Sequence, residues 1–213
     1  MKTEESIIVE GPAGRLEGLY RKGAERSMGV LILHPHPLYG GNMHNKVVFS
    51  ISRALSDAGM STLRINFRGV GLSEGTYDDG QGEQDDLRAG LDFLARELPG
   101  ARLFLAGFSF GAWLALKVGV EDTRVEAMLA VGAPAGWGDM NWLAPCEKTK
   151  LFIHGTNDEY CDPGRLGEEF RRLKDPKRLV MIENADHFFI EELGELDKIL
   201  AEYFEFLTAH RHS

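Results

Sequence analysis

The sequence lacks the features by which several protein classes are recognised. No apolar run reaches the roughly 18 residues that a membrane-spanning helix needs. The acidic N-terminal segment, Met1–Ser6, contains no apolar stretch of signal-peptide length. Basic residues are outnumbered, since 24 lysines and arginines stand against 33 aspartates and glutamates, which gives a formal net charge of −9. Because nucleic acids are bound by basic patches, we expect neither a nucleic-acid partner nor a membrane partner.

Cysteine is scarce as well. Cys146 and Cys161 are the only two, and their separation matches no metal-ligand spacing, so we expect reduced thiols and a cytoplasmic protein. A chain of 213 residues buries enough surface to fold without a disulfide or a structural metal. No repeat, low-complexity tract or linker divides it, and we therefore expect one domain over residues 1–213.

What the sequence does contain is a regular alternation of β-rich runs with amphipathic helical segments. Runs such as Val30–Leu33 and Ala127–Val131 are apolar at successive positions, which is typical of strands that helices cover on both faces. The leucines between residues 87 and 98 recur with helical spacing, and similar stripes lie between residues 47 and 58 and between residues 196 and 207. The eight runs that predict strands are Ile7–Glu10, Leu16–Tyr20, Val30–His34, Ser61–Phe67, Arg102–Gly107, Val125–Val131, Lys150–His154 and Arg178–Glu183.

This alternation indicates the fold class. Strands and helices that follow one another in turn predict an α/β protein with a doubly wound, mostly parallel sheet and helices on both faces. The ligand site of such a sheet lies beyond the carboxyl ends of its strands. The residues just after each strand are therefore the candidates for chemistry.

A nucleophile motif follows the fifth of these runs. Gly107-Phe108-Ser109-Phe110-Gly111 has the G-x-S-x-G pattern, with a buried strand before it and a helical segment after it. A sharp strand-to-helix turn holds the serine hydroxyl clear of the sheet, and the two flanking glycines remove Cβ atoms that would collide where strand and helix cross. We therefore predict Ser109 as the catalytic nucleophile.

A serine hydroxyl also needs an adjacent base and a third group that orients the base. In the fold that carries this motif, the three residues follow the order Ser, Asp or Glu, His. Asp158 comes just after the seventh run and His187 just after the eighth, so we predict Asp158 as the acid and His187 as the general base. The carboxylates that compete with Asp158 are Glu159, Asp162 and Asp186. The competing histidines, which precede the acid or lie in the C-terminal tail, are His34, His36, His44, His154, His210 and His212.

These motifs resemble those of the α/β-hydrolase superfamily over essentially the whole chain. The matching segments are Gly107–Gly111, His154–Asp158 and Ala185–His187, together with an Arg-Gly-x-Gly-x-Ser loop at 68–73. The segment His34–Lys46 is similar to a small bacterial branch of the superfamily that is related to dienelactone hydrolases. The resemblance implies an eight-stranded sheet and hydrolysis of an ester-like bond. Ser109 departs from the dienelactone hydrolases themselves, whose nucleophile is a cysteine.

Acyl transfer needs two hydrogen-bond donors aimed at the developing oxyanion. We expect one to be the backbone N–H of Phe110, and the other to come from the loop after the third run. Proline has no backbone N–H, so Pro35 and Pro37 are excluded; His36 and Leu38 remain, and we favour His36 for its offset from the strand end. The alternative role for the histidines of this loop is a metal site. Because the alternating prolines hinder convergence of the imidazoles, we predict neither a metal nor a cofactor.

The segment between the sixth and seventh runs is too short to form a large cap domain. We therefore expect an open pocket, in which Tyr39, Leu38 and Trp137 bind substrate, while Phe108 and Phe110 are either pocket walls or core residues. The predicted function is a carboxylesterase that cleaves small, short-chain esters through an acyl-enzyme. The alternatives are a thioesterase or lactone hydrolase, and a non-catalytic binding protein on the same fold.

Overall fold

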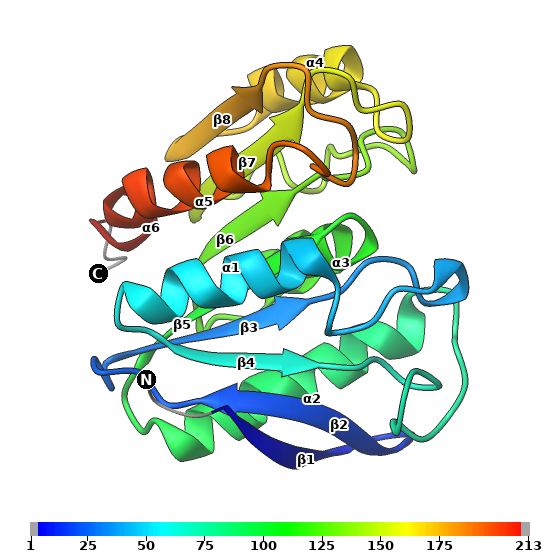
Figure 1. Ribbon diagram of the computed structural model, residues 1–213, viewed down its shortest axis with the longest axis vertical. Helices are drawn as coiled ribbons and strands as arrows, with labels where there is room; N and C mark the ends of the chain where they lie inside the picture. Colours follow the sequence, from blue (N-terminus) through cyan, green and yellow to red (C-terminus); the bar gives the residue numbers. More distant parts are fainter. Residues whose placement is uncertain (1–3, 210–213) are drawn as a thin grey trace.

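The β-rich runs form the strands of one eight-stranded sheet in the computed structural model, which describes residues 4–209 (Figure 1). The tail histidines His210 and His212 lie outside the described residues. Each of the eight predicted runs is a strand. Their bounds are β1 (Glu5–Gly11), β2 (Gly14–Arg21), β3 (Met28–Leu33), β4 (Ser61–Ile65), β5 (Arg102–Phe108), β6 (Val125–Val131), β7 (Thr149–Gly155) and β8 (Lys177–Ile182).

The strand order is β1-β2-β4-β3-β5-β6-β7-β8. β2 pairs with β1 and β4 in antiparallel fashion, and the remaining neighbours are parallel, which confirms a mostly parallel sheet. After β3 the chain forms β4 on one side and then crosses back to form β5 on the other. The loops after β3 and β5 therefore diverge at a switch point, beside the paired residues Leu33 and Gly107, and α/β sheets bind ligands at such points.

Helices cover both faces of this sheet, as the doubly wound pattern predicts. In Figure 1, α1, α5 and α6 lie over one face, while α2, α3 and α4 lie over the other. None of the helices within residues 4–209 is long and apolar enough to cross a membrane. The C-terminal apolar stripe is shared by two helices, with Tyr203 between them. The bounds are η1, a short 3-10 helix (Pro37–Tyr39), α1 (Lys46–Asp57), α2 (Gln81–Glu97), α3 (Phe110–Glu121), α4 (Pro163–Arg172), α5 (Leu193–Glu202) and α6 (Phe204–Ala209).

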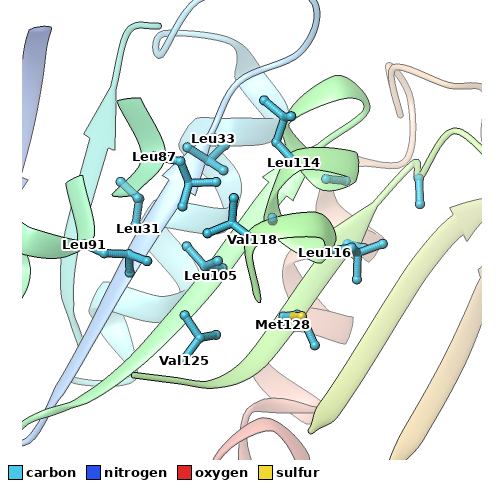
Figure 2. Close-up of a cluster of buried hydrophobic side chains, with 14 of the residues drawn as sticks. Leu31, Leu33, Leu87, Leu91, Leu105, Leu114, Leu116, Val118, Val125 and Met128 are labelled. Atoms are coloured by element: carbon cyan, nitrogen blue, oxygen red, sulfur yellow. The ribbon is translucent and has the colours of Figure 1, made fainter. Parts of the chain in front are cut away.

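Two apolar cores result from this layering. Figure 2 shows part of the core on the α2 and α3 side, where Leu87 of α2 lies near Leu33 of β3, and Val118 of α3 lies near Leu105 of β5. Leu31 of β3 belongs to this core, whereas the next residue, Ile32, belongs to the core under α1 and α5. Because successive residues of a strand point to opposite faces, a strand between two cores is buried at successive positions, and in β3 those from Val30 to Leu33 are all apolar.

The N-terminus of α3 is pressed against the ends of β3 and β5. A Cβ atom built on Gly111 would lie 2.5 Å from the carbonyl oxygen of Leu33 and 2.6 Å from that of His34. A Cβ atom on Gly107 would lie 2.3 Å from the backbone of Gly111. Only glycine permits so close an approach of three backbone segments, and this contact brings the start of α3 to the loop after β3.

Substituting alanine for glycine in two different helices should therefore have opposite effects on stability. In Gly111→Ala the new methyl group overlaps backbone atoms, and relieving an overlap in a packed interior costs on the order of 1–3 kcal/mol. In Gly167→Ala of α4 the new Cβ has nothing within 4 Å, and alanine is favoured over glycine in a helix by up to about 1 kcal/mol. Urea denaturation should show a lower free energy of unfolding for the first variant and a higher one for the second. Equal effects would mean that the backbone at Gly111 moves apart without cost.

Candidate active site

Ser109 lies in the sharp turn between β5 and α3. Its backbone has φ 55° and ψ −117°, a conformation that L-residues adopt only when the surrounding structure enforces it, at a cost of about 1–3 kcal/mol. Two hydrogen bonds hold the turn: the N–H of Ser109 donates to the carbonyl of Val131 (2.9 Å), and the N–H of Trp113 donates to the carbonyl of Ser109 (3.1 Å). The strained backbone thus presents the serine side chain at the carboxyl end of the sheet.

The side chains of Ser109, His187 and Asp158 form one chain of hydrogen bonds. The Nδ1 atom of His187 is 2.7 Å from Oδ2 of Asp158, and its Nε2 atom is 3.0 Å from the Oγ of Ser109. An ionised carboxylate can only accept hydrogen bonds, so the proton lies on Nδ1, and Nε2 accepts the hydroxyl proton of Ser109. All three side chains are buried. The structure therefore brings together the three residues that the sequence singled out.

Asp158 is anchored on both carboxylate oxygens. Its Oδ1 atom accepts the backbone N–H groups of Tyr160 (2.9 Å) and Cys161 (2.8 Å), while Oδ2 accepts from His187 and lies 3.4 Å from Nε2 of His154. Burial acts to raise the pKa of the Asp158 carboxyl. The hydrogen bond and charge of His187, with smaller contributions from Cys161 and His154, outweigh burial and lower this pKa below its ordinary value. Asp158 is therefore ionised at neutral pH.

The competing aspartates have other partners. Asp162 accepts the backbone N–H groups of Gly164 and Arg165 at the start of α4. Asp186 accepts those of Phe188 and Ile190 within the loop after β8. Both carboxylates serve local backbone turns.

The loops that carry Asp158 and His187 are tied to each other. The N–H of Asn157 donates to the carbonyl of Ala185 (3.0 Å), and the N–H of Asn184 donates to the Oγ1 atom of Thr156 (2.8 Å). A Cβ atom on Gly155 would lie 2.2 Å from the carbonyl oxygen of Ala185, so the two backbones are in direct contact. The contact between the loops that follow the parallel strands β7 and β8 therefore continues into the site and sets the separation of Asp158 and His187.

Within residues 4–209, the backbone N–H groups of Phe110, which follows Ser109 in the chain, and of His36, in the loop after β3, have no hydrogen-bond acceptor. Phe110 is the first residue of α3, and its ring lies 4.9 Å from the ring of His36. The N–H of Leu38, by contrast, donates to Nδ1 of His36 (3.3 Å) within η1. Of the two alternatives that the sequence left open, His36 therefore has the available donor.

His34 holds the loop after β3 in shape. This fully buried side chain donates from Nδ1 to the carbonyl of Pro35 (2.7 Å) and accepts at Nε2 from the backbone N–H of Phe67 (3.1 Å). Burial lowers the pKa of His34 to about 4, although the hydrogen bond to Pro35 opposes the shift. A neutral His34 thus joins the loop after β3 to the loop after β4.

An aromatic cluster centred on His36 lines one side of the site. The ring centroid of His36 lies 4.9 Å from Tyr39, 5.1 Å from Tyr77 and 5.9 Å from Trp137. Its Nε2 atom is 3.1 Å from the hydroxyl of Tyr77, and partial burial lowers the pKa of His36. Tyr39 and Trp137 are exposed, which suits them to contact a ligand. Leu38 is exposed in the same 3-10 turn.

The other side of the site is lined by rings that sequence reasoning missed. Tyr160 and Phe188 lie 5.3 Å and 5.2 Å from the ring of His187, and Tyr77 was overlooked in the same way. The signal for the first two was their position, two residues after Asp158 and one after His187. Phe108, for which the sequence left a pocket wall or a core residue open, is fully buried and packs beneath His187, with the two ring centroids 5.0 Å apart.

No helix or strand lies between β6 and β7 in the described chain, so residues 132–148 form turns and bends rather than a cap.

One group of potential metal ligands lies within residues 4–209, and it overlaps the site. Ligand atoms of Asp158, Cys161 and His187 lie within 4.8 Å of one another. Burial, aided by the charge of Asp158, raises the pKa of the Cys161 thiol to about 12, whereas a metal binds the thiolate. The facing atoms of Asp158 and His187 are already bonded to each other. A metal at this position would have to break that bond, and the residues present fit a hydrogen-bonded triad better than a metal site.

Comparison with known proteins gives a consistent result. The family described as serine aminopeptidase, S33, matches residues 30–151, which include Ser109 and the loop after β3 but end before Asp158. An uncharacterised protein of Rickettsia prowazekii is 37% identical over 216 residues, which cover 97% of this chain and 91% of the relative.

Two solved structures are similarly close. An α/β serine hydrolase homologue from Coxiella burnetii has a TM-score of 0.89 and 36% identity, over 95% of this chain and 98% of its own. An α/β serine hydrolase from Xanthomonas campestris, described as lacking a lid, has a TM-score of 0.89 and 33% identity, over 98% of this chain and 97% of its own.

The low pKa of His34 predicts a pH-dependent stability. In the unfolded chain His34 has its ordinary pKa of 6.5, and in the folded chain about 4, so between these values the unfolded state binds more protons. The contribution of the neutral, buried His34 to the free energy of unfolding is therefore fully present above pH 6.5 and is lost as the pH falls towards 4. In urea denaturation, the cost of His34→Gln should shrink by on the order of 2 kcal/mol between pH 7 and pH 4.5. The cost of the same change at the exposed His44 is the control. A cost at His34 that does not vary with pH would contradict the neutral, buried imidazole.

Proposed function

The chain belongs to the α/β serine hydrolases, in the family described as serine aminopeptidase, S33, and we propose that it is a carboxylesterase that uses Ser109, His187 and Asp158 as its catalytic triad. The observation that carries the proposal is the continuous hydrogen-bonded chain from the Ser109 hydroxyl through His187 to Asp158, with distances of 3.0 Å and 2.7 Å. In each of the two hydrogen bonds, donor and acceptor stand as proton transfer from Ser109 to His187 requires.

In the proposed acylation step, the Oγ atom of Ser109 attacks the ester carbonyl carbon and its proton passes to Nε2 of His187. The carbonyl oxygen gains the negative charge, which the backbone N–H groups of Phe110 and His36 stabilise. His187 then donates the proton to the leaving alcohol oxygen as the carbon–oxygen bond breaks, and an acyl-enzyme remains. In deacylation, water attacks the acyl carbon and gives its proton to His187. His187 then returns the proton to the Oγ atom of Ser109 as the bond to the acyl group breaks, and the acid is released. Asp158 stays ionised throughout and stabilises the imidazolium of His187.

The open site supports small, short-chain esters as substrates. Turns and bends alone connect β6 to β7 in the described chain, so no cap encloses a long acyl chain. We assign substrate contacts to Tyr39, Leu38 and Trp137, whose exposed apolar surfaces lie on or beside the turn that carries His36. Ester and amide hydrolysis use the same triad, and the family description names aminopeptidases. Comparing p-nitrophenyl butyrate with alanine p-nitroanilide separates the two activities, and we expect turnover of the ester.

Ser109→Ala should abolish ester hydrolysis, because no other hydroxyl bonds to His187 in the described residues. The kcat for p-nitrophenyl butyrate should fall by about 10⁴-fold or more. Labelling by a fluorophosphonate probe should disappear, since it reports the same nucleophile. The melting temperature should stay close to that of the wild type, which separates lost chemistry from lost folding. Activity above about a tenth of wild type would rule out Ser109 as the nucleophile.

Asp158→Asn should lower kcat by about 10³–10⁴-fold, because the imidazole loses both its orienting carboxylate and the charge that stabilises its protonated form. Asp162→Asn and Asp186→Asn are matched controls. Their carboxylates accept backbone N–H groups only, so each should change kcat by less than about tenfold. Similar losses in all three variants would mean that another carboxylate orients His187.

A further inference from the structure

The chemistry of the proposed mechanism determines where the alcohol part of the substrate must lie. His187 can protonate the leaving oxygen only if that oxygen comes within about 2.6–3.2 Å of Nε2. The group attached to this oxygen must therefore contact whatever lies beside His187 on its solvent side. The acyl oxygen, in contrast, points to the N–H groups of Phe110 and His36. The two ends of the ester thus meet different parts of the site. The proposed substrate contacts of Tyr39, Leu38 and Trp137 all lie on the His36 side.

Two aromatic rings stand beside His187 on its solvent side. Tyr160 lies 5.3 Å from the imidazole at an interplanar angle of 41°, and Phe188 lies 5.2 Å from it at 80°. The two rings are 5.5 Å apart and meet edge to face at 73°. Together they form an aromatic corner beside His187. Aromatic rings prefer these two geometries, offset stacking and edge-to-face contact.

The rings are exposed although their backbone is held in place. Tyr160 is 70% exposed and Phe188 43% exposed, whereas Phe108, on the inner side of His187, is fully buried. The N–H of Tyr160 is bonded to Asp158, and that of Phe188 to Asp186. The hydroxyl of Tyr160 has no hydrogen-bond partner in the described part of the chain. Since Phe108 and Asp158 already hold His187, the two outer rings are not needed to keep it in position.

The charge of the surrounding loops limits what this corner can accept. Neither the segment 155–162 nor the segment 183–192 contains a lysine or an arginine, and together they carry Asp158, Glu159, Asp162, Glu183, Asp186, Glu191 and Glu192. A leaving group with a phosphate or carboxylate would meet no lysine or arginine of these two segments, and several of their carboxylates. The corner therefore favours an uncharged group with an aromatic face.

We propose that Tyr160 and Phe188 form a leaving-group subsite that binds the uncharged aromatic alcohol of an aryl ester. This subsite rests on the proposed esterase function and extends it to a substrate class. During acylation the aryl ring stacks on Tyr160 with its edge towards Phe188, while its oxygen receives the proton from His187. After the aryl alcohol leaves, the corner is empty and the attacking water approaches through it. The subsite therefore acts on acylation and not on deacylation.

Two acetate esters with leaving groups of similar acidity test this assignment: phenyl acetate and hexafluoroisopropyl acetate. In Tyr160→Ala and in Phe188→Ala, kcat/KM for phenyl acetate should fall about three- to tenfold, which is the range expected for one aromatic contact. The value for hexafluoroisopropyl acetate should change by less than about twofold. Tyr160→Phe should keep the wild-type preference, because the lost hydroxyl has no partner. Leu72→Ala removes another exposed apolar side chain, from the loop after β4, and should leave both values unchanged.

The other outcomes separate the subsite from the esterase function. An equal loss on both esters, together with slower labelling by a fluorophosphonate probe, would mean that the rings only position His187, and it would overturn the subsite. Unchanged values in both alanine variants would overturn it as well, while turnover that depends on Ser109 would leave the esterase function intact. If the wild-type protein hydrolysed neither ester and took up no probe, both proposals would fall.

Discussion

The direct backbone contact between the start of α3 and the ends of β3 and β5 is the constraint on which the rest of the site depends. It exists because Gly107 and Gly111 have no Cβ atoms at the two points of closest approach. The contact forces the turn at Ser109 into a strained conformation and brings the N–H of Phe110 next to the loop that carries His36. Separation of these segments would move Ser109 and Phe110 away from the loop that carries His36.

Two buried groups around Ser109, His34 and Asp158, have opposite charged states although burial disfavours the charged form of both. His34 is buried with one carbonyl acceptor and one N–H donor, so the neutral imidazole is favoured and the loop after β3 keeps its shape. Asp158 is buried with three hydrogen-bond donors directed at its oxygens, so the ionised carboxylate is favoured despite burial. Number and type of partners, rather than burial itself, decide which form of a group is stable. The site combines a fixed charge at Asp158 with a neutral framework at His34.

The mouth of the site is built from exposed aromatic rings on separate loops. The cluster around His36 lies over the loops after β3 and β4, and the pair of Tyr160 and Phe188 lies on the loops after β7 and β8. Both groups adjoin the triad, and the chain between β6 and β7 does not cover them with a helix or strand. In the proposed esterase these rings supply apolar contacts that a cap would otherwise provide. Because the two groups stand at opposite ends of the proposed reacting ester, they contact different parts of the substrate.

The sequence by itself determined the features that depend on local patterns. The central strands between two cores are mostly apolar at successive positions, so they could be identified from runs such as Val30–Leu33. Ser109 was recognisable because a strand-to-helix turn of this kind needs glycines at fixed spacing, and the order of the three triad candidates follows from the fold that carries the motif.

Tertiary structure decided what depends on contacts between distant segments. The choice of His36 over Leu38 required the hydrogen bond within η1. The joining role of His34 required Phe67, 33 residues away, and the corner of Tyr160 and Phe188 required the pairing of β7 with β8. Periodicity along the chain reports which face of an element is buried, but only the packed sheet determines which loops meet at its edge.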